Sequence, residues 1–143
     1  MENRLLIYYS HPAYTYFTEI EDLDTEYLSQ FQKNFPSARI IYPNQMNDIG
    51  MEAYLKAVNQ SDIICYRGNT WGVVFEVLTA IALSKHVFNI GQRRYIIKEE
   101  TLEFVKLFKG NHYSKSDMDL FNLLFPDSYK SFVKLLGVRK NEN

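Results

Sequence analysis

The stretch that decides the fold is DIICYRGNTWGVVFEVLTAIA, residues 62–82. Its first five residues predict a buried strand, because a short apolar run that ends in loop residues is typical of a parallel sheet. After the loop, residues 72–84 predict a helix with one carboxylate, Glu76, early in an otherwise apolar setting. Ligands of open α/β sheets bind outside the carboxyl ends of the strands. Glu76 is therefore the first candidate for a functional residue.

Similar apolar runs alternate with helical patterns on both sides of this stretch. Strands are predicted at residues 5–9, 38–42, 62–66 and 86–90, and helices at 24–34, 51–59 and 72–84. We expect Asp24 or Thr25 to be the N-cap of the first helix, after a long loop that begins at His11. Strands and helices that alternate at this spacing favour βαβ units. The predicted fold class is α/β, with a parallel sheet covered on both faces.

The C-terminal third of the chain has a helical pattern. Residues 93–98 fit either a fifth strand or the start of a helix through Phe108. A helix follows Ser116, Pro126 interrupts it, and a last amphipathic segment ends before Gly137. The expected organisation is an α/β domain at residues 1–110 and a helical extension at residues 111–143, packed on the same domain or on a second subunit.

Composition limits the classes of partner. The 143 residues carry a formal net charge of −1, which gives no general attraction to nucleic acid or to an acidic membrane. The acidic cluster at residues 19–26 is interpreted as a solvated face. No apolar run approaches the roughly 20 residues that span a bilayer, and residues 1–4 do not resemble a signal peptide. We expect a cytoplasmic protein with neither nucleic acid nor membrane as a partner.

Metal and cofactor sites are not indicated. The one cysteine, Cys65, lies inside an apolar strand and is interpreted as a small buried hydrophobic residue. His11, His86 and His112 are too widely separated for metal-ligand spacing. Neither G-x-G-x-x-G nor G-x-x-x-x-G-K-[ST] occurs. We therefore expect no metal and no cofactor.

The order of short motifs resembles one family. The run IYYSHP at residues 7–12 resembles the I-Y-x-x-x-P first-strand signature of the nucleoside 2-deoxyribosyltransferase-like proteins. The resemblance continues at Asp62-Ile63-Ile64, Glu76, Ala80, Ala82 and Lys85-His86-Val87. It covers residues 5–90, and its specificity comes from the order and spacing of the motifs.

This resemblance implies both a fold and a chemistry. The fold would be a flavodoxin/Rossmann-like three-layer sandwich with a central parallel sheet of four to five strands and a helical C-terminal part. The activity would be cleavage or transfer at the N-glycosidic bond of a nucleoside or nucleotide, with Glu76 as the nucleophile. Tyr8 would lie in the pocket floor near it. Members of this family complete their pockets across subunits, so a homo-oligomer is expected.

One departure from the family concerns the leaving base. Members carry an aspartate, where this chain has Tyr54, that helps to protonate the base. Asp48 and Glu52 are possible substitutes, although neither has the expected register. Arg67 has two interpretations, a contact to a substrate phosphate or an ordinary exposed charge at a strand end. If the leaving base lacks its acid, the chain binds nucleotides without cleaving them.

Further candidates for substrate binding are Tyr9, His11, Tyr54, Arg67, Asn69, Trp71 and Gly72. Burial would raise the pKa of Glu76, so an ionised Glu76 needs a hydrogen-bond donor such as Tyr8 or Tyr9. His11 is either a ligand contact or an exposed turn residue. Trp71 either stacks on a base or covers the core.

Three other functions stay open. The first is a non-catalytic module that senses nucleotides on the same fold. The second is an interaction protein with an aromatic surface. The third rests on Trp71 before Glu76, which resembles the W-C-x-x-E element of Toll/interleukin-receptor-like domains and implies cleavage of the nicotinamide bond of NAD. That spacing is one residue longer here.

Overall fold

The computed structural model describes residues 5–12, 15, 18–43, 46, 50–110 and 115–141. His112 and Asp48 lie outside these residues. The elements in chain order are β1 (Leu6–Ser10), α1 (Glu19–Asn34), β2 (Arg39–Ile41), α2 (Met51–Gln60), β3 (Ile63–Tyr66), α3 (Trp71–Ala82), β4 (His86–Asn89), β5 (Arg94–Tyr95), α4 (Lys98–Gly110), α5 (Lys115–Leu124) and α6 (Pro126–Asn141). None of the helices in the described part of the chain is long and apolar enough to cross a membrane.

The sheet has the strand order β2-β1-β3-β4-β5. All neighbouring strands are parallel except β5, which pairs antiparallel with β4. This is a Rossmann/flavodoxin-like α/β fold, which confirms the α/β class predicted from the alternating pattern and the fold implied by the resemblance. The chain runs outward from β1 to β2 and then returns past β1 to β3, so the order reverses between β1 and β3. Ligands of such sheets bind in the crevice at this switch point.

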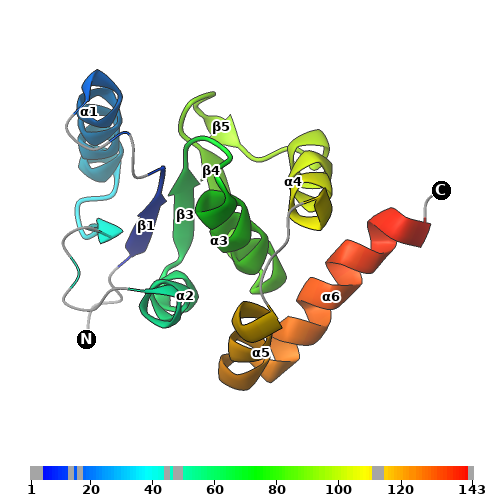
Figure 1. Ribbon diagram of the computed structural model, residues 1–143. Coiled ribbons are helices and arrows are strands. Elements are labelled where there is room, and N and C mark those ends of the chain that lie inside the picture. The colour runs from blue at the N-terminus through cyan, green and yellow to red at the C-terminus, as the bar shows by residue number, and fades with distance from the viewer. Residues whose placement is uncertain are drawn as a thin grey trace.

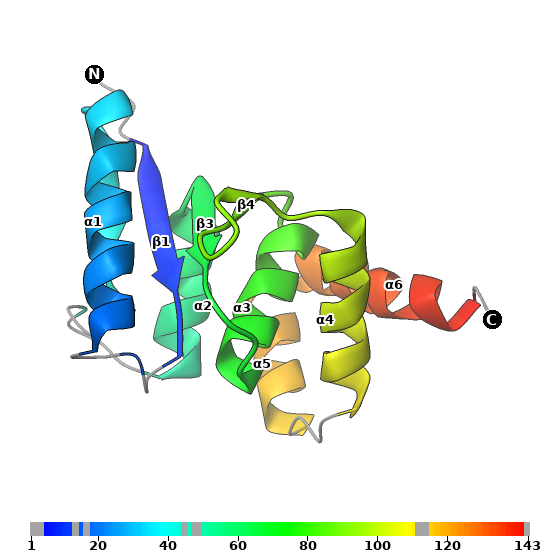
Figure 2. The same ribbon diagram turned by 90° about the horizontal axis from the view of Figure 1, so that it is seen from above.

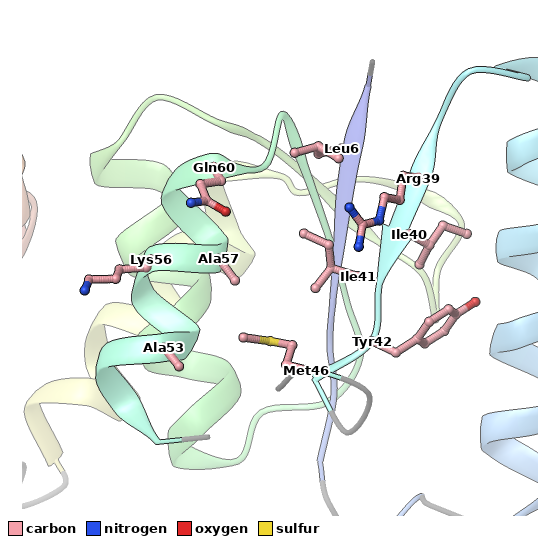
Figure 3. A pocket seen from close by; sticks show the side chains of 10 residues that line it. All are labelled: Leu6, Arg39, Ile40, Ile41, Tyr42, Met46, Ala53, Lys56, Ala57 and Gln60. Carbon is pink, nitrogen blue, oxygen red and sulfur yellow. The ribbon is translucent and has the colours of Figure 1, made fainter. Parts of the chain in front are cut away.

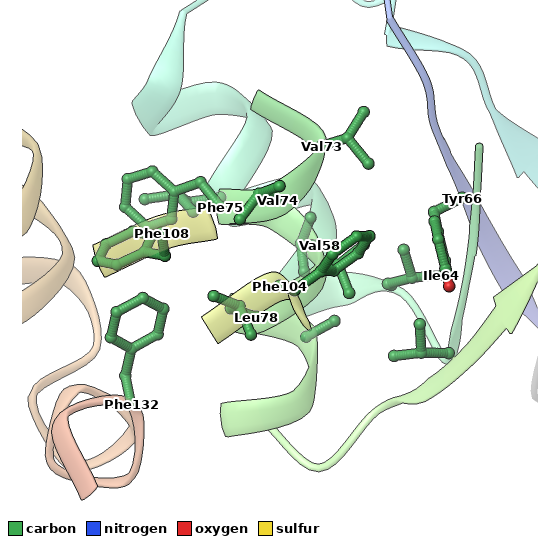
Figure 4. Packing of buried hydrophobic residues seen from close by; sticks show 14 of the residues in the cluster. Val58, Ile64, Tyr66, Val73, Val74, Phe75, Leu78, Phe104, Phe108 and Phe132 are labelled. Carbon is green, nitrogen blue, oxygen red and sulfur yellow. The ribbon is translucent and has the colours of Figure 1, made fainter. Parts of the chain in front are cut away.

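Helices cover the two faces of the sheet unequally. Helix α1 lies on one face, and α2 and α3 lie on the other (Figures 1 and 2). Helices α4 and α6 pack on α3, and α5 packs on α6 and α2. The side chains of residues 73–80 in α3 are consequently all buried. The rings of Phe75, Phe108 and Phe132 form a mutually contacting triad, with centroids 5.2–5.9 Å apart (Figure 4). A helix that is covered on both sides must be apolar on both sides, which explains its composition.

Two helix boundaries differ from the prediction, the start of α1 and the end of α6. Helix α1 begins at Glu19, with Thr18 as its N-cap, and not at Asp24. Three acidic residues in its first turn complement the positive end of the helix dipole, so this cluster marks the helix start. Residues 93–98 contain both alternatives, the short strand β5 and the start of α4. Helix α6 continues through Gly137 to Asn141, since one helical glycine costs only about 1 kcal/mol.

Gly68 brings the β3–α3 loop against the loop that follows β1. Its φ is +78°, and an added Cβ would lie 2.9 Å from Pro12 Cγ. We expect Gly68→Ala to lower the free energy of unfolding by about 1–3 kcal/mol, because alanine meets both the strained backbone and the contact. Chemical denaturation measures this loss. Gly72→Ala is the matched control, since nothing lies within 4 Å of its added Cβ. Equal stabilities for the two variants would contradict the expectation.

Candidate functional site

Glu76 lies in the second turn of α3 and reaches the end of β1. Its side chain is nearly enclosed, with 8% of the residue surface exposed. The Ser10 hydroxyl donates a hydrogen bond of 2.7 Å to Oε1, and the Tyr8 hydroxyl donates one of 3.2 Å to Oε2. Both donors are fully buried. The structure therefore places a buried carboxylate, held by two hydroxyls, at the switch point of the sheet.

The environment of Glu76 places its titration near neutral pH. Burial raises its pKa to about 7, and the hydrogen bonds from Ser10 and Tyr8 oppose this rise. Within the described residues, no lysine, arginine or histidine forms an ion pair with Glu76. The carboxylate thus depends on neutral donors, and both of its protonation states are accessible near pH 7. This property is common among catalytic carboxylates.

A second buried carboxylate lies on the opposite face of the sheet. Asp24, on α1, is 1% exposed and accepts a hydrogen bond from the Tyr9 hydroxyl. Arg67 donates two hydrogen bonds of 2.7 Å to it, from Nε to Oδ2 and from Nη2 to Oδ1. Two expectations are therefore wrong, since Asp24 is not part of a solvated face and Arg67 is not an ordinary exposed charge. Of the two tyrosines expected as donors to Glu76, Tyr8 is the one that bonds to it, and Tyr9 bonds to Asp24.

The alternation of side chains along β1 explains this arrangement. Consecutive strand residues point to opposite faces, so Tyr8 reaches Glu76 on the α3 side and Tyr9 reaches Asp24 on the α1 side. Asp24 has a full positive charge against it, whereas Glu76 has only hydroxyls. A fully paired carboxylate suits a structural role, because its charge is already neutralised. The contrast selects Glu76 as the carboxylate available for chemistry.

The structure brings only some of the predicted site residues together. Glu76 and Tyr8 are in contact, and the His11 ring stacks on Tyr9 at 3.9 Å. Burial lowers the pKa of His11. Trp71 is 55% exposed at the start of α3, so it does not serve as a buried cover of the core.

Three further predicted residues lie elsewhere around this edge. Tyr54 is half-buried on α2, Asn69 is exposed in the β3–α3 loop, and Gly72 lies in the first turn of α3. None of the described hydrogen bonds joins them to Glu76. Their part in substrate binding stays a prediction.

Sequence reasoning missed Ser10. The predicted strand ended at residue 9, whereas β1 continues to Ser10, which therefore shares a face with Tyr8 two residues earlier. Cys65 is buried as predicted, and burial raises the pKa of its thiol to about 12. It stays protonated at neutral pH and is no nucleophile there.

Two pockets lie beside the sheet. One, of about 600 Å³, lies at the carboxyl ends of β3 and β4 and is lined in part by Arg67, Asn69 and Asn89. The other, of about 530 Å³, lies between α2 and β2, where Arg39 and Lys56 flank apolar side chains (Figure 3). Glu76 lines neither of these two pockets. In the described part of the chain, no three histidine, cysteine or acidic side chains gather as a metal site.

Fold and site together define an α/β protein with a buried, hydroxyl-bound carboxylate at the switch point of its sheet. Comparison of the chain with protein-family models, with curated proteins and with solved structures finds no match.

Proposed function

We propose that this protein cleaves or transfers the N-glycosidic bond of a nucleoside or nucleotide, with Glu76 as the nucleophile. The observation that carries the proposal is the setting of Glu76, an acid within the buried stretch of α3 that meets two buried hydroxyls at the switch point. Nucleophilic carboxylates form a glycosyl-enzyme, which a second group or water then resolves. The resemblance in residues 5–90 supports this bond as the target.

The immediate contacts of Glu76 suit such a role. Ser10 and Tyr8 hold the carboxylate in one orientation, which favours attack from a fixed direction. A pKa of about 7 leaves a substantial ionised fraction at neutral pH. The proposal therefore assigns Glu76 and Tyr8 to the reaction, and places the substrate at the carboxyl ends of β1 and β3.

A second candidate is a binding module that lacks catalysis. Tyr54 stands where the resembled family has its acid, and a tyrosine hydroxyl is a much weaker acid than a carboxyl group. A leaving base that receives no proton leaves slowly. In this case the site would bind a nucleoside or nucleotide and leave its glycosidic bond intact.

The test is release of free base, measured by chromatography, from a panel of deoxynucleosides, their monophosphates and NAD. The unsubstituted protein is compared with Glu76→Gln, which keeps the side-chain shape, and with Glu26→Gln, at an exposed position on α1, as the matched control. We expect release by the unsubstituted and control proteins and a loss of at least about 1,000-fold in Glu76→Gln. Ligand-induced thermal stabilisation without release would favour the binding module. Release from NAD alone would favour the nicotinamide bond as the target.

A further inference from the structure

We propose that Ser10 is a positioning residue that anchors Oε1 of Glu76, so that Oε2 is the oxygen that attacks the anomeric carbon. This inference rests on the proposed function, and it adds a residue and an assignment of the two carboxylate oxygens. It comes from the unequal hydrogen bonds that the two oxygens accept.

The two hydrogen bonds differ in length. The 2.7 Å bond from Ser10 to Oε1 is near the preferred length for a hydroxyl donor, whereas the 3.2 Å bond from Tyr8 to Oε2 lies beyond the usual range. A shorter hydroxyl-to-carboxylate bond is the stronger one. Ser10 therefore holds Oε1 in place. Breaking the hydrogen bond to Oε2 costs less free energy than breaking the one to Oε1.

The backbone around Ser10 is itself fixed. Ser10 is the last residue of β1, its Cα is in register with that of Tyr66 on β3, and its carbonyl accepts a 2.9 Å hydrogen bond from the Arg67 amide. Arg67 in turn is held by Asp24. The anchor for Oε1 thus belongs to the rigid sheet rather than to a loop, as precise positioning requires.

The reaction follows from this assignment. In the first step, Oε2 forms a bond to the anomeric carbon while the carbon–nitrogen bond breaks, and its electron pair leaves with the base, which takes a proton from solvent. Oε1 becomes the carbonyl oxygen of the ester and remains an acceptor for Ser10. Oε2 becomes the ester oxygen, a poor acceptor, so the long bond from Tyr8 is the one given up. Water then attacks the anomeric carbon, returns a proton to solvent and releases Glu76.

The experiment compares Ser10→Ala with Ser10→Thr, Tyr8→Phe and Ser61→Ala. Ser61 is a matched control, since it is fully buried and donates a 2.7 Å hydrogen bond, but to the carbonyl of Ala57. Two quantities are measured in each protein. One is kcat and KM for base release, and the other is the titration midpoint of the Glu76 carboxyl carbon, followed by ¹³C NMR without substrate.

We expect Ser10→Ala to lower kcat by about 10- to 100-fold with little change in KM, because the lost contact orients the nucleophile and does not bind substrate. The titration midpoint of Glu76 rises, and it rises more than in Tyr8→Phe, since Ser10 is the stronger donor. Ser10→Thr keeps a hydroxyl, so its kcat and titration midpoint stay closer to those of the unsubstituted protein than the values of Ser10→Ala do. Ser61→Ala leaves both unchanged.

Three results would overturn the assignment. One is a Ser10→Ala protein with the kcat and titration midpoint of the unsubstituted protein. The second is a fall in kcat with an unmoved midpoint, which would place the effect of Ser10 outside Glu76. The third is a larger shift of the titration midpoint in Tyr8→Phe than in Ser10→Ala, which would exchange the roles of Oε1 and Oε2. If Ser10→Ala shifts the titration midpoint of Glu76 but the unsubstituted protein releases no base, the proposed function is overturned, and the reaction at Oε2 with it.

Discussion

Asp24→Asn is expected to lower the free energy of unfolding by about 3–5 kcal/mol, the usual loss when one partner of a buried ion pair is removed. Asp24 is almost fully buried and accepts hydrogen bonds from Tyr9 and Arg67. The substitution removes the negative charge that faces the Arg67 guanidinium, whose side chain is 30% exposed. The stability lost is therefore mostly the free energy of this buried, charged pair of hydrogen bonds.

Chemical denaturation at pH 7 measures this loss, and two further variants locate its cause. Asp22→Asn removes a carboxylate from the exposed side of the same helix and is expected to change stability by less than about 0.5 kcal/mol. Asp24→Asn combined with Arg67→Gln removes both charges and should be more stable than the sum of the single losses predicts. An Asp24→Asn protein within about 1 kcal/mol of the unsubstituted one would refute the structural role of this pair.

This pair also shows where sequence reasoning stops. Arg67 and Asp24 are 43 residues apart, and no local pattern joins two positions on different elements. The burial of Asp24 did have a local signal. Asp24 and Leu28 are four residues apart, so they share one helix face, and both are buried. The signal was hidden because the predicted helix began at Asp24, where a carboxylate has the separate role of an N-cap.

The candidate site itself was partly predictable. Glu76 stood out because a single carboxylate in an apolar helix has few structural explanations, and Tyr8 followed from the first-strand motif. The arrangement of the C-terminal helices was not predictable, since their periodicity gives each helix an apolar face but no partner. The apolar character of residues 73–82 on all sides was the sign that something would cover the outer side of this helix, as α4 and α6 do.

Glu76→Gln is expected to leave stability unchanged at pH 4 and to raise it at pH 8 by as much as roughly 3 kcal/mol. The pKa of Glu76 is about 7 in the folded protein, against 4.5 for an unperturbed glutamate. A folded-state pKa above the unfolded one means that the unfolded chain loses its proton first. The stability that protonated Glu76 contributes is therefore fully present below about pH 4.5. It is lost as the pH rises to about 7, and it stays lost above that.

The size of this effect follows from the conversion of about 1.4 kcal/mol for each pKa unit. A glutamine amide has no charge to desolvate, and its oxygen still accepts from Ser10. Equilibrium denaturation between pH 4 and 8 measures the difference between the two proteins, which cancels the titration of groups common to both. Glu52→Gln, at an exposed ion pair with Lys56, should follow the unsubstituted protein within about 0.5 kcal/mol throughout. If the free energies of unfolding of Glu76→Gln and the unsubstituted protein change with pH in parallel, a destabilising charge at this position is ruled out.

The two carboxylates that meet β1 thus predict opposite outcomes for the same kind of substitution. Removing the charge of Asp24 weakens the fold, because it removes an ion pair in which Arg67 already neutralises that charge. Removing the charge of Glu76 strengthens the fold above neutral pH, because the described residues offer it hydroxyl donors only. A buried charge that lowers stability is retained most readily where it serves a reaction, since stability and activity often trade against each other at active sites. A Glu76→Gln protein that is more stable and releases no base would show this trade at a single residue.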